Sequence, residues 1–179
     1  IDDSRLRLGR QYLEEIDNAY FDGGSYRVKP IDELELMIFG GRPISYFSST
    51  SGDSTYGGSV TYQITRQTKA GLTYYRYDTD EHNDDIGKFD LWHMFNENIQ
   101  SHSEFSLLDG DPYLLESTLY TLWDPWDLDA IFQIVRLFDD IGDHTINFDP
   151  YFPLLFDYEP FTYGSMTVTK GLGQYFSLV

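Results

Sequence analysis

Short apolar stretches alternate with polar and glycine-rich segments along this 179-residue chain. In three of these stretches apolar residues recur three or four positions apart, which is the spacing of one helix face, and an Asp-Pro sequence indicates the start of a fourth helix. The predicted helices cover residues 4–21, residues 88–99, a segment that begins at Asp111-Pro112, and residues 124–142. The last is the most regular and carries one stripe of apolar side chains: Leu128, Ile131, Phe132, Val135 and Phe138.

Capping residues support three of these helices. Asp111 and Asp124 each precede a proline, and an Asp at the N-cap with Pro at the first helical position is a common helix start. Ser4 is a candidate N-cap for the first helix, which Gly23-Gly24 would end.

Other segments alternate apolar and polar residues, which predicts strands. The clearest pair covers residues 59–66 and 72–79, and Gly71 between them favours a hairpin. Leu34, Leu36 and Ile38 alternate with other residues in a way that suits a strand with one buried face. A last hairpin is predicted from residues 163–169 and 174–178.

These elements predict one α+β domain over residues 1–179, with a mostly antiparallel sheet of four to six strands and three or four helices. Strands and helices do not alternate regularly, which argues against a doubly wound parallel sheet. The chain length suits one domain, and no linker or repeat divides it. No apolar run approaches the ~20 residues of a membrane-spanning helix.

Charge is distributed very unevenly along the chain. The formal net charge is −18, from 30 Asp and Glu against 12 Lys and Arg. Residues 77–169 hold 20 of the acids and only two bases, Lys88 and Arg136, so this stretch carries the whole excess. Such a surface repels nucleic acid and anionic lipid headgroups, which predicts neither as a direct partner. Halophilic adaptation is an alternative, but it would spread the acids over the entire chain.

The sequence contains no motif that identifies a catalytic, cofactor or metal site. There is no cysteine, which excludes thiolate chemistry and disulfides. An EF-hand beginning at Asp78 would need glycine sixth and glutamate twelfth, but Asn83 and Phe89 stand there. The four histidines form no metal-binding spacing. We therefore predict no catalytic residue, no cofactor and no metal.

The leading hypothesis is an acidic module that binds a basic nucleic-acid-binding protein, with inhibition of that protein as one consequence of binding. Carboxylates gathered on one face would match the charge density of a nucleic acid and steer association with such a partner. Trp126 is a candidate anchor, because tryptophan is enriched at interface hot spots. The predicted partner-binding residues are Asp78, Asp80, Glu81, Asp84, Asp85, Asp124, Trp126, Asp127 and Asp129.

Two other classes of function fit the same sequence. A structural subunit of a larger viral or organellar assembly would expose an apolar patch in isolation. A carbohydrate-active or other small-substrate enzyme would place a carboxylate pair in a cleft near Trp92 and Trp123.

Overall fold

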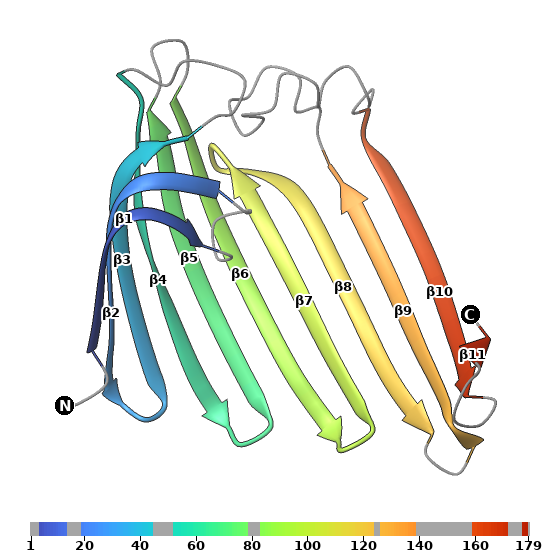
Figure 1. Cartoon of the computed structure of the whole chain (residues 1–179). Coiled ribbons are helices and arrows are strands. Elements are labelled where there is room, and N and C mark those ends of the chain that lie inside the picture. The colour runs from blue at the N-terminus through green and yellow to red at the C-terminus, as the bar shows by residue number, and fades with distance from the viewer. Residues whose placement is uncertain are drawn as a thin grey trace.

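Every strand pairs with the next strand along the chain, so the protein forms one antiparallel sheet that runs back and forth without a crossover (Figure 1). The structure is a computed structural model that describes residues 4–13, 19–44, 52–78, 83–123, 126–138, 159–171 and 177–178. Within these ranges it contains eleven strands. No helix in the described part of the chain is long and apolar enough to cross a membrane.

The strands are 10 to 14 residues long, apart from the two-residue β11. Their bounds are β1 Ser4–Leu13, β2 Ala19–Ile31, β3 Leu34–Pro43, β4 Ser54–Thr65, β5 Thr68–Asp78, β6 Asn83–Asn96, β7 Ile99–Leu108, β8 Asp111–Trp123, β9 Leu128–Leu137, β10 Phe161–Gly171 and β11 Ser177–Leu178.

The connections differ between the two ends of the sheet. Those after β2, β4, β6, β8 and β10 have two to five residues and define what we name the short-turn end. Those after β1, β3, β5, β7 and β9 define the long-connection end, which is named for its two long links, ten residues after β3 and 23 residues after β9. A sheet built from adjacent antiparallel pairs needs only such local connections.

The predicted α+β class is wrong, because the four segments expected to be helices contribute strands instead. Residues 4–21 supply β1 and the start of β2, and residues 88–99 lie in β6, its turn and the first residue of β7. Asp111-Pro112 begins β8, and residues 124–142 contain β9, with 124–125 and 139–142 outside the described residues. The eleven strands also exceed the predicted four to six.

Strand β9 explains why helical spacing misled the prediction. Its cross-strand partners place Phe132 and Ile134 on one face of the sheet and Ile131 and Val135 on the other. Because both faces of this strand carry apolar residues, apolar side chains also recur three or four positions apart. An apolar run of this length fits a strand as well as a helix.

The Asp-Pro sequence at Asp111 follows a hairpin turn and does not cap a helix. Asp109 and Gly110 have φ angles of 52° and 93°, and a two-residue turn with both φ positive is the connection that antiparallel strands favour. The Asp109 side chain also accepts a hydrogen bond from the Asp85 backbone N–H at 2.8 Å. The Asp109-Gly110 dipeptide was the sequence signal for this hairpin.

The strand predictions for residues 59–66 and 72–79 are confirmed by β4 and β5, although the turn lies at Arg66–Gln67 and residue 79 is not described. Residues 34–38 lie in β3, but its alternation has the opposite sense to the expectation. Ile38 is 64% exposed, whereas Met37 is buried. The predicted C-terminal hairpin is present as β10 and the short β11, with residues 172–176 undescribed.

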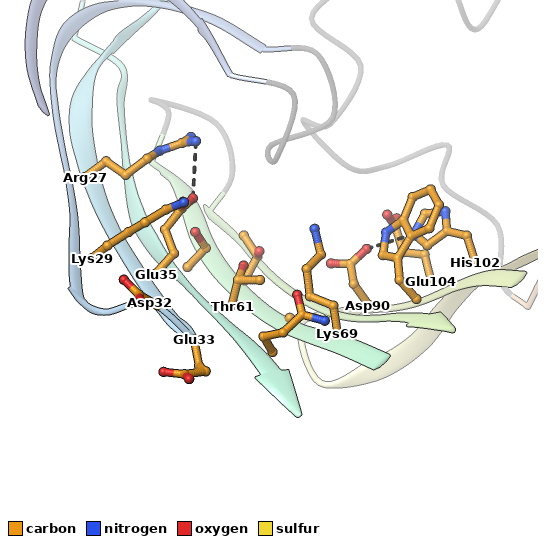
Figure 2. A pocket seen from close by; sticks show the side chains of 15 residues that line it. Arg27, Lys29, Asp32, Glu33, Glu35, Thr61, Lys69, Asp90, His102 and Glu104 are labelled. Atoms are coloured by element: carbon orange, nitrogen blue, oxygen red, sulfur yellow. Dashed lines mark hydrogen bonds and ion pairs between the residues drawn. The ribbon is translucent and has the colours of Figure 1, made fainter. Parts of the chain in front are cut away.

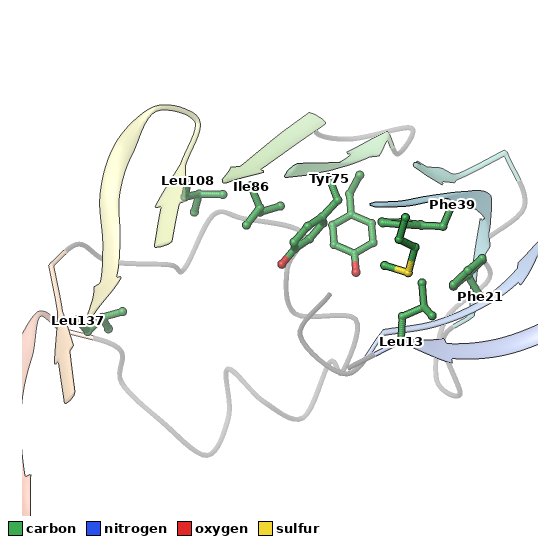
Figure 3. Packing of buried hydrophobic residues seen from close by; sticks show 9 residues of the cluster. Leu13, Phe21, Phe39, Tyr75, Ile86, Leu108 and Leu137 are labelled. Carbon is green, nitrogen blue, oxygen red and sulfur yellow. The ribbon is translucent and has the colours of Figure 1, made fainter. Parts of the chain in front are cut away.

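The sheet curves, and its concave face carries a buried apolar cluster toward the long-connection end (Figure 3). Cross-strand pairs such as Tyr75 with Ile86 and Ile86 with Leu108 place these residues on the same face. The aromatic rings of Phe21 and Phe39 lie 5.7 Å apart, and those of Tyr75 and Tyr77 meet edge to face at 5.6 Å. The cluster consists of Leu13, Phe21, Met37, Phe39, Tyr75, Tyr77, Ile86, Leu108 and Leu137.

Two paired glycines bring β2 and β3 into unusually close contact beside this cluster. Gly23 and Gly41 are cross-strand partners, and a Cβ added to Gly41 would lie 2.7 Å from the Gly23 Cα and 2.8 Å from the Phe21 ring. A Cβ added to Gly23 would lie 2.6 Å from the Gly41 Cα. Neither position has room for a methyl group without a backbone shift.

We predict that Gly41→Ala lowers the free energy of unfolding by about 1–3 kcal/mol, because the new methyl group overpacks this contact. Denaturant unfolding of the purified chain measures the effect. Gly87→Ala is the matched control, since its Cβ would meet only the Leu107 Cβ at 4.0 Å. Equal midpoints for the two variants would contradict the predicted crowding.

Candidate functional site

The convex face of the sheet is mostly apolar and exposed. Alternation along each strand, interrupted by a few register shifts, sends one set of side chains to this face. Its neutral polar residues include His93, which is hydrogen-bonded to Thr68, and the hydrogen-bonded pair Ser103 and Ser117. Leu8 and Leu72 are 77% and 61% exposed. Other exposed members are Leu6, Tyr26, Ile38, Tyr56, Val60, Tyr62, Ile64, Tyr74, Phe89, Phe132, Ile134 and Met166.

This convex face contains a band without any Asp, Glu, Lys or Arg. On β6 the band runs from Gly87 to Phe95, and on β5 from Thr68 to Tyr74. At about 3.4 Å per residue the nine positions on β6 span roughly 27 Å along the strand. We name this region of the described residues the apolar band.

Charged side chains of the convex face border the apolar band, mainly toward the long-connection end. Arg10 donates two hydrogen bonds of 3.1 Å to the Asp22 carboxylate, and these bonds lower the Asp22 pKa. Arg76 lies 3.2 Å from Asp85, whose negative charge raises the Arg76 pKa. The other charged residues of this border are Arg42, Asp78 and Arg136; Lys170 lies toward the short-turn end.

Aromatic residues stand at both margins of the apolar band. Tyr12, Tyr20, Tyr56 and Tyr74 lie next to the charged border, and the Tyr12 and Tyr20 rings are 5.0 Å apart. The Tyr74 hydroxyl donates a 2.6 Å hydrogen bond to Asp85, and this bond raises the Tyr74 pKa.

At the short-turn end the aromatic residues are Phe95, Trp123 and Trp126. Trp126 is 71% exposed. Aromatic residues with a polar tip suit a boundary between an apolar and a wet environment, so both margins have the composition of such a boundary.

The concave face contains a polar hollow of about 490 Å³ nearer the short-turn end than the apolar cluster (Figure 2). Its floor consists of small and hydroxyl-bearing residues of β4 and β5, including Ser59, Thr61, Gly71 and Thr73. Its ionisable and aromatic lining residues are Arg27, Lys29, Asp32, Glu33, Glu35, Lys69, Asp90, Trp92, His102 and Glu104.

The acidic side of the polar hollow is formed by β6 and β7. Asp90 and Glu104 are cross-strand partners, and His102 Nε2 lies 3.3 Å from Asp90 Oδ1. The Trp92 ring stacks on the His102 ring at 4.1 Å, which fixes both side chains. Glu104 also accepts a 3.2 Å hydrogen bond from Lys88, whose side chain is only 5% exposed.

The opposite side of the polar hollow is formed by β2, β3 and the turn between them. Arg27 Nη1 and Lys29 Nζ lie 3.3 and 3.4 Å from the two carboxylate oxygens of Glu35. Asp32 and Glu33 also line this side, so two bases stand beside three carboxylates there.

The predicted partner-binding acids do not form one face. Asp78 and Asp85 lie on the convex face at the long-connection end, whereas Asp84 is buried on the concave face. Trp126, Asp127 and Asp129 lie at the opposite, short-turn end of the sheet. Asp80, Glu81 and Asp124 lie outside the described residues.

Of the residues that line the polar hollow, Trp92 was named in the sequence-based enzyme alternative, but the sequence offers no motif for the others. They come from strands β2 to β7 and from the turn between β2 and β3. The two members of each charged pair lie on different strands. The usable signal was alternation: Arg5 and Arg7, then Arg27 and Lys29, recur at every second position opposite the apolar residues. That pattern marks strands with one polar and one apolar face.

Comparisons with known proteins identify no relative: no family model, curated protein or solved structure matches this chain. Among the described residues, no group of three or more His, Asp or Glu side chains is arranged to hold a metal ion. The chemistry available in the polar hollow is therefore that of paired charges, hydroxyl groups and one stacked aromatic pair.

We predict that Tyr74 ionises above the ordinary tyrosine pKa of about 10, because Asp85 accepts its hydroxyl proton in a hydrogen bond and opposes a second negative charge. Asp85→Asn should lower the pKa of Tyr74 toward the ordinary value. NMR titration of ¹³C-labelled tyrosine, with Tyr74→Phe to assign the signal, measures the Tyr74 pKa in the unchanged chain and in the Asp85→Asn variant. Asp78→Asn is the control, and an identical shift in that variant would refute the specific pairing.

Proposed function

We propose that this protein is a membrane-embedded sheet whose convex face contacts the hydrocarbon of a lipid bilayer and whose concave face borders water. The observation that carries this proposal is the apolar band, bordered by ion pairs and tyrosines at one margin and by Phe95, Trp123 and Trp126 at the other. Its polar hollow then lines an aqueous path.

The dimensions of the sheet support a bilayer as the environment. Membrane-spanning strands have about 9–11 residues, and the apolar band that they present to lipid is about 25 Å tall. The ten long strands here have 10 to 14 residues, and the β6 part of the band is roughly 27 Å long before any tilt.

The backbone also suits an apolar solvent. Hydrocarbon offers no hydrogen-bond partner, so a spanning structure must pair its own N–H and C=O groups. Strands β2 to β9 each pair with a strand on both sides over nearly their whole length. Strand β1 and most of β10 form the two edges of the described sheet, and in a bilayer these edges must contact protein or water instead of lipid. In water, by contrast, exposed apolar side chains across a whole sheet face would promote association.

This proposal departs from the sequence-based expectation of no membrane partner. That expectation rested on the net charge of the whole chain, but the ionic residues of the convex face lie outside the apolar band. An apolar surface is also what the assembly hypothesis requires. The lack of Asp, Glu, Lys and Arg in the apolar band, the aromatic residues at its margins and the strand length favour lipid over a partner protein as what the convex face contacts.

The acidic-module hypothesis stays a prediction and has weaker support. Its two contact segments, around Asp78–Asp85 and around Trp126, lie at opposite ends of the sheet. A single basic surface would have to reach both ends to engage them together.

Tryptophan quenching by brominated phosphatidylcholine tests the proposal. In a chain with Trp92, Trp123 and Trp126 replaced by Phe, we introduce one tryptophan at Leu72 on the convex face or at Thr61 on the concave face. We expect strong quenching at Leu72→Trp and little at Thr61→Trp after folding into vesicles. Equal quenching at the two positions, or failure of the chain to associate with vesicles, refutes a lipid-facing convex surface.

A charge introduced into the apolar band gives an independent prediction. Leu72→Lys should destabilise the vesicle-folded protein by about 2–4 kcal/mol, because an ammonium group in hydrocarbon loses its hydration. The same substitution at a water-exposed position changes stability by about 0.5 kcal/mol or less. Thr61→Lys, toward the polar hollow, is the matched control, and urea unfolding from vesicles compares the two. A Leu72→Lys loss no larger than the control's would count against lipid contact.

A further inference from the structure

Ion pairs compensate the charged groups on both sides of the polar hollow. On one side the carboxylate oxygens of Glu35 lie 3.3 and 3.4 Å from nitrogen atoms of Arg27 and Lys29. On the other side Glu104 accepts a 3.2 Å hydrogen bond from Lys88. A compensated charge attracts a dissolved ion more weakly than an unpaired charge does. These pairs therefore favour a solute without net charge.

The excess of acids in the lining lies in exposed residues at one end. Five carboxylates and three Lys or Arg residues line the hollow, a difference of two. Within the described ranges Asp32, Glu33 and Lys69 are the charged lining residues without an ion pair, and all three are exposed at the short-turn end. Salt and water screen such exposed charges.

The carboxylates of β6 and β7 keep capacity to accept hydrogen bonds. Lys88 and Ser106 both donate to Glu104 Oε1, at 3.2 and 3.3 Å. His102 approaches Asp90 at Oδ1. Glu104 Oε2 and Asp90 Oδ2 accept no hydrogen bond from any described residue. A hydroxyl group that donates to such an ionised oxygen forms a stronger bond than one between neutral groups.

The opposite side and the floor supply further polar groups. The Arg27 guanidinium is oriented by Glu35 and, through Nη2, by Met37 Sδ at 3.3 Å. Thr61 and Gln63 add hydroxyl and amide groups along the floor (Figure 2). A hydroxyl group both donates and accepts hydrogen bonds, so a solute rich in hydroxyl groups can bond to every part of this lining.

Trp92 adds an apolar surface beside the acceptors. Its ring stacks on the His102 ring at 4.1 Å and 14°, which fixes its orientation, and the residue is 36% exposed. Its cross-strand partner on the other side is Lys69. A sugar ring has an apolar C–H face and hydroxyl groups at its edge. Such a ring can pack on the indole while its hydroxyl groups reach Asp90 and Glu104.

The size of the hollow suits more than one sugar ring. Its volume of about 490 Å³ is within the range of about 300–1,000 Å³ that small-molecule pockets have. Four strand spacings, about 19 Å along the sheet, separate Arg27 on β2 from Trp92 on β6. A single ring is too short to contact both residues.

We propose that the polar hollow binds a short, uncharged oligosaccharide. One ring packs on Trp92 and bonds to Asp90 and Glu104, and the chain extends over the floor toward Arg27. This inference rests on the proposed function, since it assigns a solute class to the same water-facing surface.

Maltotriose binding to the full chain in detergent or vesicles tests the inference, with Trp92 as the fluorescent reporter in a Trp123→Phe, Trp126→Phe background. We expect a saturable change that about 0.5 M NaCl leaves unaltered, because screening acts little on an uncharged solute. Trigalacturonate, which is anionic, should bind at least about tenfold more weakly, a difference of about 1.4 kcal/mol.

A substitution locates the binding site. Trp92→Ala should weaken maltotriose binding at least about tenfold in isothermal titration calorimetry. Trp123→Ala, outside the polar hollow, is the matched control and should bind as the unchanged chain does. If Trp92→Ala impairs folding, Asp90→Asn repeats the comparison.

Three results overturn the inference: no saturable binding of maltotriose, binding of trigalacturonate at least as tight, or unchanged binding in the folded Trp92→Ala variant. Tighter, salt-sensitive binding of a cationic trisaccharide of glucosamine also overturns it, since that result identifies a site for cations. Brominated-lipid quenching of the Leu72→Trp chain is measured alongside. A chain that faces lipid but binds no maltotriose refutes only this inference, and one that does not face lipid refutes the proposed function.

Discussion

The continuous antiparallel backbone ladder is the constraint on which every other feature depends. Because each of the ten long strands pairs with its sequence neighbour, side chains alternate between two faces across the full width of the sheet. One residue of slip in any pair would exchange the two faces on the far side of that pair. The apolar band and the polar hollow are therefore two consequences of a single register.

The sequence supports the existence of strands more readily than the size of the sheet. The pair over residues 59–66 and 72–79 was predictable, because β-branched and aromatic residues alternate there with polar ones. Segments such as β9 were not, since apolar side chains on both faces produce the spacing of a helix. The Asp109-Gly110 dipeptide is a signal for a hairpin turn, and it predicts a strand instead of a helix after Asp111.

The candidate site was less predictable than the fold, for a physical reason. A hydrophobic run is normally read as the inside of a protein, so Leu36 and Ile38 were assigned to a buried face. Here the polar alternates, Glu35 among them, line a hollow and the apolar ones are exposed. Net charge led to a functional hypothesis based on acidity alone, because a sum over the chain does not show that Asp, Glu, Lys and Arg are absent from one part of the described surface.

The paired glycines of β2 and β3 have a bearing on how this part of the sheet can change in evolution. Figure 1 shows these strands bending over toward the long-connection end, where Gly23 and Gly41 lie. A side chain at either position would collide with the backbone of the other, so neither glycine can be exchanged while the two strands keep this distance. In a chain that keeps the bend, the two positions are therefore constrained as one unit, although neither carries a side chain.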